Sequence, residues 1–279
     1  MPPNEPIDQA SRDPGLSPAQ VLRWWAEAGV DLAIDEEPHD RFAAPSAPAQ
    51  PARAPPALAP SRVAPRMEQA AASQPDEAAR SARSLAARAA SLDELRDLLA
   101  NFEGCSLKAT ATQLVFSDGA PNARVMLVGE APGGDEDRIG RPFVGRAGQL
   151  LDRMLAAIGL DRTKVYIANI VAWRPPGNRT PTLQETAICL PFIQRQIELV
   201  NPDLLVCLGA SSAQTLLGVK DGITRVRGKW FDYPLGPRTI KALAMLHPAY
   251  LLRQPTQKRA AWRDLRALAQ ALAEIGNSE

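Results

Sequence analysis

Histidine is nearly absent from this sequence, with only two copies, His39 and His247, among 279 residues. Metal centres built from several histidines, as many zinc sites are, are therefore excluded. His39 stands in a proline- and alanine-rich stretch that we expect to be disordered. Any imidazole chemistry in this protein is therefore expected at His247.

Cysteine is also scarce, and the three copies at Cys105, Cys189 and Cys207 do not form a disulfide framework. No stretch reaches the roughly 20 apolar residues of a membrane span. The opening residues, MPPNEPIDQASRDPG, lack the apolar core of a secretory signal. Basic and acidic side chains nearly balance, at 32 and 31, without the strongly basic character that indicates nucleic-acid binding. We expect a monomer of the reducing cytoplasm, without membrane association.

Apolar and aromatic side chains are sparse in residues 1–85, which hold about half of the 26 prolines. Such a composition buries too little apolar surface to offset the entropy of folding, which predicts a disordered Pro/Ala-rich tail. Within it, SPAQVLRWWAEAGVDLAID predicts a short amphipathic helix over residues 18–29, capped by Ser17. This helix is either marginal by itself or a docking peptide for a protein partner.

The remaining residues, 90–279, alternate between apolar strands and amphipathic helices. The strongest strand patterns cover residues 124–129, 164–169, 202–209 and 239–246. Between the second and third of them, a helix is expected with Thr180 as its cap. Continuous apolar strands separated by helices are typical of a parallel sheet covered on both faces. The sequence therefore predicts one domain, a three-layer α/β/α sandwich around a mainly parallel four-stranded sheet.

Three polar loops follow strands of this expected sheet: GEAPGGDEDRIGRPFVG, NIVAWRPPGNR and HPAYLLRQP. Ligands bind at the carboxyl ends of parallel strands, so these loops should open at one edge. The residues brought together there include Glu130, Phe143, Asn169 and His247, a set that suits recognition of a planar polar ring. GEAPGG lacks the Lys-Ser/Thr of a phosphate-binding loop and does not fit G-x-G-x-x-G, so nucleotide binding is not indicated.

Three segments, GEAPGGDEDRIGRPFVGRAGQLLDRML, YIANIVAWRPPGNRTP and HPAYLLR, together resemble the family 4 uracil-DNA glycosylases. The resemblance covers about residues 98–270, with the segments in the same order and spacing. It implies a base excision repair enzyme that flips uracil out of DNA and hydrolyses its N-glycosidic bond, leaving an abasic site. A base inside a duplex cannot be reached, so it must be extruded before such chemistry.

The resemblance also implies two catalytic residues. Gly129, Glu130 and Ala131 would form the loop that positions the attacking water. The better-known branch of the superfamily has an aspartate at the place of Ala131, so Glu130 is the expected substitute. His247 would face the 2-carbonyl of uracil and stabilise the charge that develops there.

Five further residues would bind the base or the DNA. Glu136 would crowd the ring position where thymine carries its methyl group, and Phe143 would stack on the extruded base. Asn169 would read the base edge, accepting from the ring N–H and donating to the 4-carbonyl. Leu251 would enter the duplex as a wedge, with a place in the protein core as the alternative, and Arg253 would meet a phosphate.

The family also carries a four-iron cluster on four cysteines. The corresponding positions here are Phe102, Cys105, Trp173 and Cys189, so two of the four thiols are replaced by aromatic rings. Clusters of this type normally need four protein ligands. Our hypothesis is that the two rings pack near the two remaining thiols and form a small apolar core, and we expect no metal or cofactor.

Three other functions stay open. One is a non-catalytic uracil-DNA binder, and another is a relative whose histidine forms a lasting covalent bond with the sugar. The third is a redox sensor built on an iron–sulfur cluster. The intact Glu130, Asn169 and His247 favour catalysis. Covalent behaviour is associated with a basic insert in the first loop, where GGDEDRIGRPF is short and acidic.

Overall fold

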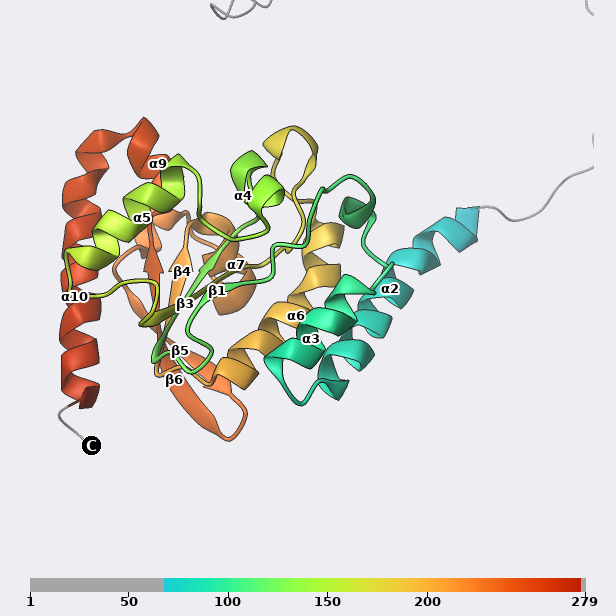
Figure 1. Cartoon of the computed structure of the whole chain (residues 1–279), viewed down its shortest axis with the longest axis horizontal. Coiled ribbons are helices and arrows are strands. Elements are labelled where there is room, and N and C mark those ends of the chain that lie inside the picture. Colours follow the sequence, from blue (N-terminus) through green and yellow to red (C-terminus); the bar gives the residue numbers. More distant parts are fainter. Residues whose placement is uncertain (1–67, 277–279) are drawn as a thin grey trace, which may run out of the picture. The chain divides into compact units, whose positions relative to one another are not determined.

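The computed structural model describes residues 68–276, with side chains from residue 77 onward. The helix predicted over 18–29 and most of the predicted tail lie outside the described residues. Helices cover both faces of a central sheet (Figure 1). Within the described residues, no helix combines the length and the apolarity that crossing a membrane requires.

Six strands form one mixed sheet in the order β1-β3-β2-β4-β6-β5. Their bounds are β1 (Asp118–Gly119), β2 (Val125–Gly129), β3 (Val165–Asn169), β4 (Leu204–Leu208), β5 (Trp230–Leu235) and β6 (Arg238–Met245). The four central strands run parallel, whereas β1 and β5 pair antiparallel at the edges. The four parallel strands are those that the sequence predicts, but the sheet is larger than the predicted four strands.

Strand β5, at one edge of the sheet, was not predicted from the sequence. It contains the exposed Asp232 and also Pro234, which cannot donate a backbone hydrogen bond. Proline is tolerated in strands at a sheet edge, where β5 lies. The tight turn to β6 contains Gly236 with a positive φ of 56°. Phe231, Tyr233 and Leu235 alternate with Asp232 and Pro234, but the internal proline argues against a strand, which forms here because a hairpin pairs it with β6.

The helices pack in two layers. Their bounds are α2 (Glu68–Arg88), α3 (Leu92–Ala100), α4 (Gly134–Ile139), α5 (Arg146–Ala156), α6 (Leu183–Val200), α7 (Ala210–Leu217), α8 (Ile223–Val226), α9 (Pro248–Arg253) and α10 (Lys258–Gly276). Met126 and Val128 of β2 pack in one core with α2, α3 and α6, and Val125 and Leu127 pack in a second core with α5 and α10. This alternation gives the predicted three layers.

Helix α2 begins within the segment that the sequence assigns to the tail. Ala79, Ala82 and Ala86 are buried, and α2 packs against α6. Arg195 of α6 also donates to the carbonyl of Ala89 at 3.0 and 2.7 Å. The folded part therefore starts before residue 85, and the predicted boundary is too late. Alanine carries little apolar surface, so composition did not reveal this packing.

Helix α6 begins two residues later than expected. Its cap is Thr182, whose hydroxyl accepts from the backbone N–H of Glu185 at 3.1 Å, while the Glu185 carboxylate accepts from the Thr182 N–H at 2.7 Å. Arg179 pairs with the same carboxylate at 2.8 and 2.6 Å and lowers the pKa of Glu185 to about 2. Thr180, the predicted cap, is thereby left in the loop before the helix.

Candidate active site

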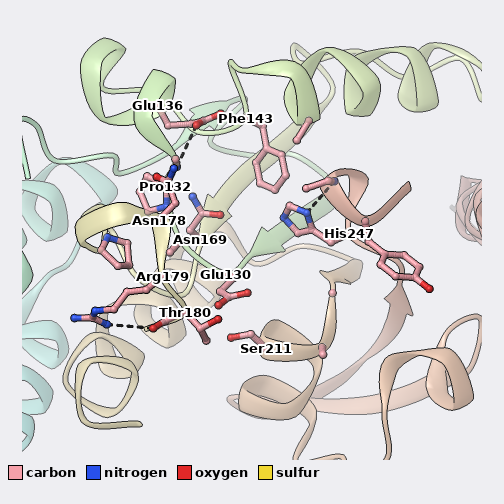
Figure 2. Close-up of a pocket in the computed structure, with 18 of the residues that line it drawn as sticks. Glu130, Pro132, Glu136, Phe143, Asn169, Asn178, Arg179, Thr180, Ser211 and His247 are labelled. Carbon is pink, nitrogen blue, oxygen red and sulfur yellow. Dashed lines mark hydrogen bonds between the residues drawn. The ribbon is translucent and has the colours of Figure 1, made fainter. Parts of the chain in front are cut away.

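A cavity of about 630 Å³ lies at the carboxyl edge of the sheet (Figure 2). The segments that follow the four parallel strands β2, β3, β4 and β6 all line it. The predicted residues in its lining are Glu130, Ala131, Glu136, Phe143, Asn169, His247 and Arg253. The structure thus brings together side chains from three loops, as the topology predicts.

Gly129, at the end of β2, allows a close approach between two side chains that line the cavity. A Cβ atom there would lie 2.4 Å from Oδ1 of Asn169 and 2.7 Å from Cζ of Phe143. Gly129 pairs with Asn169 across strands β2 and β3, which fixes this approach. The absent side chain therefore lets an aromatic ring and an amide meet over the end of β2.

Asn169 lines the cavity and carries a buried polar atom without a hydrogen-bond partner. Its side chain is 6% exposed, and Oδ1 has no hydrogen-bond partner among the described residues. Leaving a buried acceptor unpaired costs about 1–3 kcal/mol, and native proteins seldom do so without a reason. This amide is therefore set to receive a hydrogen bond from a ligand in the cavity.

His247 is held as a neutral ring with a known tautomer. The backbone N–H of Ala249 donates to Nδ1 at 3.1 Å, so the single proton of the neutral ring is on Nε2. Burial, and then the charge of Arg253, lower the pKa of His247 to about 4. At neutral pH the ring therefore offers one N–H donor. Its centre lies 5.4 Å from that of the Phe143 ring, with 31° between the planes.

Glu130 follows directly after β2 and is half-buried in the cavity wall. Loss of solvent raises the pKa of its carboxyl group. Figure 2 places its side chain on the same side of the cavity as Ser211. The next residue, Ala131, contributes only a methyl group, so Glu130 is the carboxylate available at the end of this strand.

Glu136 makes contacts that the sequence did not reveal. Its carboxylate accepts from the backbone N–H groups of Gly133, Val144 and Gly145, at 3.1, 2.9 and 2.9 Å. These bonds tie the start of α4 to the loop that carries Phe143. Glu136 therefore braces this loop, and its predicted exclusion of thymine stays a prediction.

Leu251 does not line the cavity and lies in the protein core, which is the alternative that the sequence left open beside its role as a wedge. Its side chain is 1% exposed and belongs to the core that includes Met154 of α5 and Leu265 of α10. Helix α9 turns this position inward, so in this structure the side chain is not free to enter a duplex. The exposed Arg253, two residues on, lines the cavity as expected.

Several lining residues were missed by the sequence analysis. They are Asn178, Arg179 and Thr180 after β3, Ser211 after β4, and Tyr250 on α9. Their positions after parallel strands were the available signal. The loop after β3 is fixed locally, because Arg174 donates to Oδ1 of Asn178 at 2.8 Å.

The four positions that correspond to cluster cysteines are all buried in one apolar core: Phe102, Cys105, Trp173 and Cys189. The two sulfur atoms lie 3.9 Å apart, and the Phe102 ring packs 5.3 Å from that of Phe192. Within residues 77–276, no group of three or more His, Cys, Asp or Glu side chains could hold a metal. Two thiols and two aromatic rings do not fit a cluster that needs four protein ligands.

Comparisons with known proteins show which family the chain is similar to. Residues 116–266 match the profile of the Uracil DNA glycosylase superfamily. The type-4 uracil-DNA glycosylase of Thermotoga maritima is 47% identical over 150 residues, which cover 53% of this chain and 77% of that protein. That of Archaeoglobus fulgidus is 42% identical over 169 residues, covering 59% and 85%. That of Pyrobaculum aerophilum is 37% identical over 178 residues, covering 62% and 91%.

The matched region contains every residue of the cavity lining, from the loop after β2 to helix α9. The chain therefore belongs to the uracil DNA glycosylase superfamily and, within it, to the type-4 uracil-DNA glycosylases.

Proposed function

We propose that the cavity of this uracil-DNA glycosylase receives a uracil flipped out of DNA and that its side chains cleave the N-glycosidic bond, leaving an abasic site. The observation that carries the assignment of this cavity is the buried, unpaired Oδ1 of Asn169 beside the Phe143 ring. Uracil offers the matching groups, a ring N–H to donate to Oδ1 and a 4-carbonyl to accept from the amide N–H. Cytosine reverses both groups, so the same amide disfavours it.

His247 stabilises the leaving base in this proposal. Cleavage leaves negative charge on uracil and positive charge on the sugar. The Nε2–H of the neutral ring donates to the 2-carbonyl as that charge develops, because Nδ1 is already engaged by the backbone of Ala249. One such preorganised donor contributes about 100- to 1000-fold in rate.

Glu130 orients the water that attacks the sugar. Its half-buried carboxylate has a raised pKa, which makes it a stronger base than a solvated carboxylate. Phe143 offers one face of its ring to the base, and base–aromatic stacking contributes about 1–3 kcal/mol. At the cavity rim, the exposed Arg253 meets a phosphate of the extruded strand.

An excision assay tests this function. The full-length protein is incubated with oligonucleotides that carry one uracil, either single-stranded or paired with G or A, and with a thymine control. We expect alkali-labile abasic sites in the uracil strands alone. Binding without cleavage would favour the non-catalytic alternative, and a protein–DNA adduct on a denaturing gel would favour the covalent one.

We also propose that the enzyme works without an iron–sulfur cluster. The buried core around Cys105, Cys189, Phe102 and Trp173 supports this, because its donor set does not fit. Purified protein should be colourless and should keep its activity in chelators. A brown preparation with about four irons per chain would contradict the proposal.

The domain itself begins at α2 in our proposal, since this helix packs against α6. Residues 1–67 remain a candidate segment for a protein partner, as their sequence suggests. A monomer in a reducing compartment is the expected working state, and the three free, buried thiols support the reducing compartment.

A further inference from the structure

We propose that Arg162 is a positioning residue that holds the Phe143 ring in place for stacking on the base. The inference rests on the proposed function, since it assigns a supporting role at the same cavity. Arg162 lies just before β3 and is not among the residues that line the cavity.

Phe143 has a backbone conformation that needs outside support. Its φ is 55°, in the left-handed region that residues other than glycine rarely adopt. Its carbonyl oxygen also sits against the first turn of α5, because a Cβ atom on Gly148 would lie 1.6 Å from it. The turn at Phe143 is therefore packed closely against α5, and its backbone conformation is unfavourable.

The Arg162 guanidinium supplies this support. It donates to the carbonyl of Phe143 and, at 3.1 Å, to that of Pro142. Arg162 is in turn oriented by Asp118 on β1 and by Asp152 on α5, the latter at 2.8 Å. The side chain is only 20% exposed, so this arrangement lies largely out of solvent.

The ring has little freedom on the cavity side. A Cβ atom on Gly129 would lie 2.7 Å from Cζ of this ring. The ring centre lies 5.4 Å from that of the His247 ring (Figure 2). A peptide that rotated at Phe143 would swing the ring out of this position. Arg162 thus fixes, through two backbone carbonyls, the side chain that we assign to base stacking.

Arg141 provides a matched control. It donates to both oxygens of the same Asp118 at 2.9 Å, and it lies in the same loop two residues before Phe143. Its side chain is 55% exposed, and no hydrogen bond joins it to the Phe143 carbonyl. Substituting Arg141 therefore removes an equal charge from the same carboxylate without releasing the ring.

The test is a double-mutant cycle on kcat/KM for a single-stranded uracil oligonucleotide. It uses Arg162→Met, Phe143→Leu, the combined variant and Arg141→Met. We expect Arg162→Met to lose about 10- to 100-fold, the range that stacking accounts for. In the Phe143→Leu background the same change should cost less than about threefold, because coupled sites are not additive. Arg141→Met should stay within about threefold of the wild type.

Equal losses from Arg162→Met in both backgrounds, or an equal loss from Arg141→Met, would overturn the inference. Arg162→Lys, which keeps the charge but not the forked donors, enters the same cycle where the methionine variant does not fold. A crystal structure of the Arg162 variant gives a result that does not depend on activity. Phe143 should leave its left-handed conformation, and an unchanged Phe143 would refute the proposal even where the wild type proved inactive on uracil.

Discussion

The backbone N–H of Ala249 donates to Nδ1 of His247 at 3.1 Å, and this bond places the proton of the neutral ring on Nε2. A backbone N–H can only donate, so Nδ1 must be unprotonated. Burial keeps the ring neutral by lowering its pKa to about 4. In the proposed mechanism, a hydrogen bond from this neutral ring therefore stabilises the charge that develops on the base.

Nitrogen-15 NMR of the two histidines tests this protonation state. At pH 7 we expect His247 to show an unprotonated Nδ1 and a protonated Nε2, with no titration between pH 8 and 6. A midpoint near the ordinary value of 6.5 would contradict the account. The unfolded chain binds a proton at His247 before the folded protein does, so folding stability should fall as the pH drops from 6.5 towards 4. His247→Gln should reduce this loss in chemical denaturation.

Asn169→Asp tests the reading of the base. An ionised carboxylate accepts from the ring N–H of uracil but cannot donate to the 4-carbonyl, so uracil release should fall about 100-fold or more. When protonated, the new side chain matches cytosine, and release of cytosine should rise as the pH is lowered. Asn201→Asp is the control, because Asn201 lies at the C-terminal end of α6 and does not line the cavity. Unchanged kinetics in Asn169→Asp would remove Asn169 from the site.

Gly129→Ala tests the close approach of Asn169 and Phe143 at the end of β2. The added Cβ would meet Oδ1 of Asn169 at 2.4 Å and the Phe143 ring at 2.7 Å, so both must shift. A displacement of this size costs on the order of 100-fold in rate. Gly222→Ala serves as the control, since its Cβ would meet nothing within 4 Å and its φ of −64° suits alanine. Equal activity in the two variants would show that this close approach is unimportant.

Two truncations locate the start of the domain. Deleting residues 1–67 should leave the melting temperature and the excision of uracil from short oligonucleotides nearly unchanged. Deleting residues 1–88 removes α2, whose buried Ala82 and Ala86 pack in the core with α6, and should lower the melting temperature by about 4 °C or more. Thermal unfolding followed by circular dichroism measures both. Equal melting temperatures would mean that α2 does not contribute to the fold.

The fold was predictable where strands are buried on both faces. Residues 125–129 and 204–208 are apolar throughout, so their sequence alone indicates central parallel strands. β5 was missed because Pro234 interrupts its alternating pattern, and α2 was missed because its packing relies on alanines, which carry little apolar surface. Such elements form because of contacts with other segments of the chain.

The candidate site, too, could be predicted from the sequence only in part. The predicted ends of the parallel strands were enough to bring Glu130, Asn169 and His247 together, because the sheet topology fixes those positions. The sequence could not decide between the wedge and the core for Leu251, since the direction of this side chain depends on how α9 packs against α5. The support of Phe143 by Arg162 was equally hidden, because it runs through backbone carbonyls.

Single-turnover release of uracil by His247→Ala, beside the wild type and His39→Ala, tests the central claim most directly. His39 is the only other histidine in the sequence, which makes it the matched control. We predict that His247→Ala loses about 100- to 1000-fold in rate while keeping its fold, and that His39→Ala stays at the wild-type rate. Near-normal release by His247→Ala would contradict the claim that this imidazole stabilises the departing base.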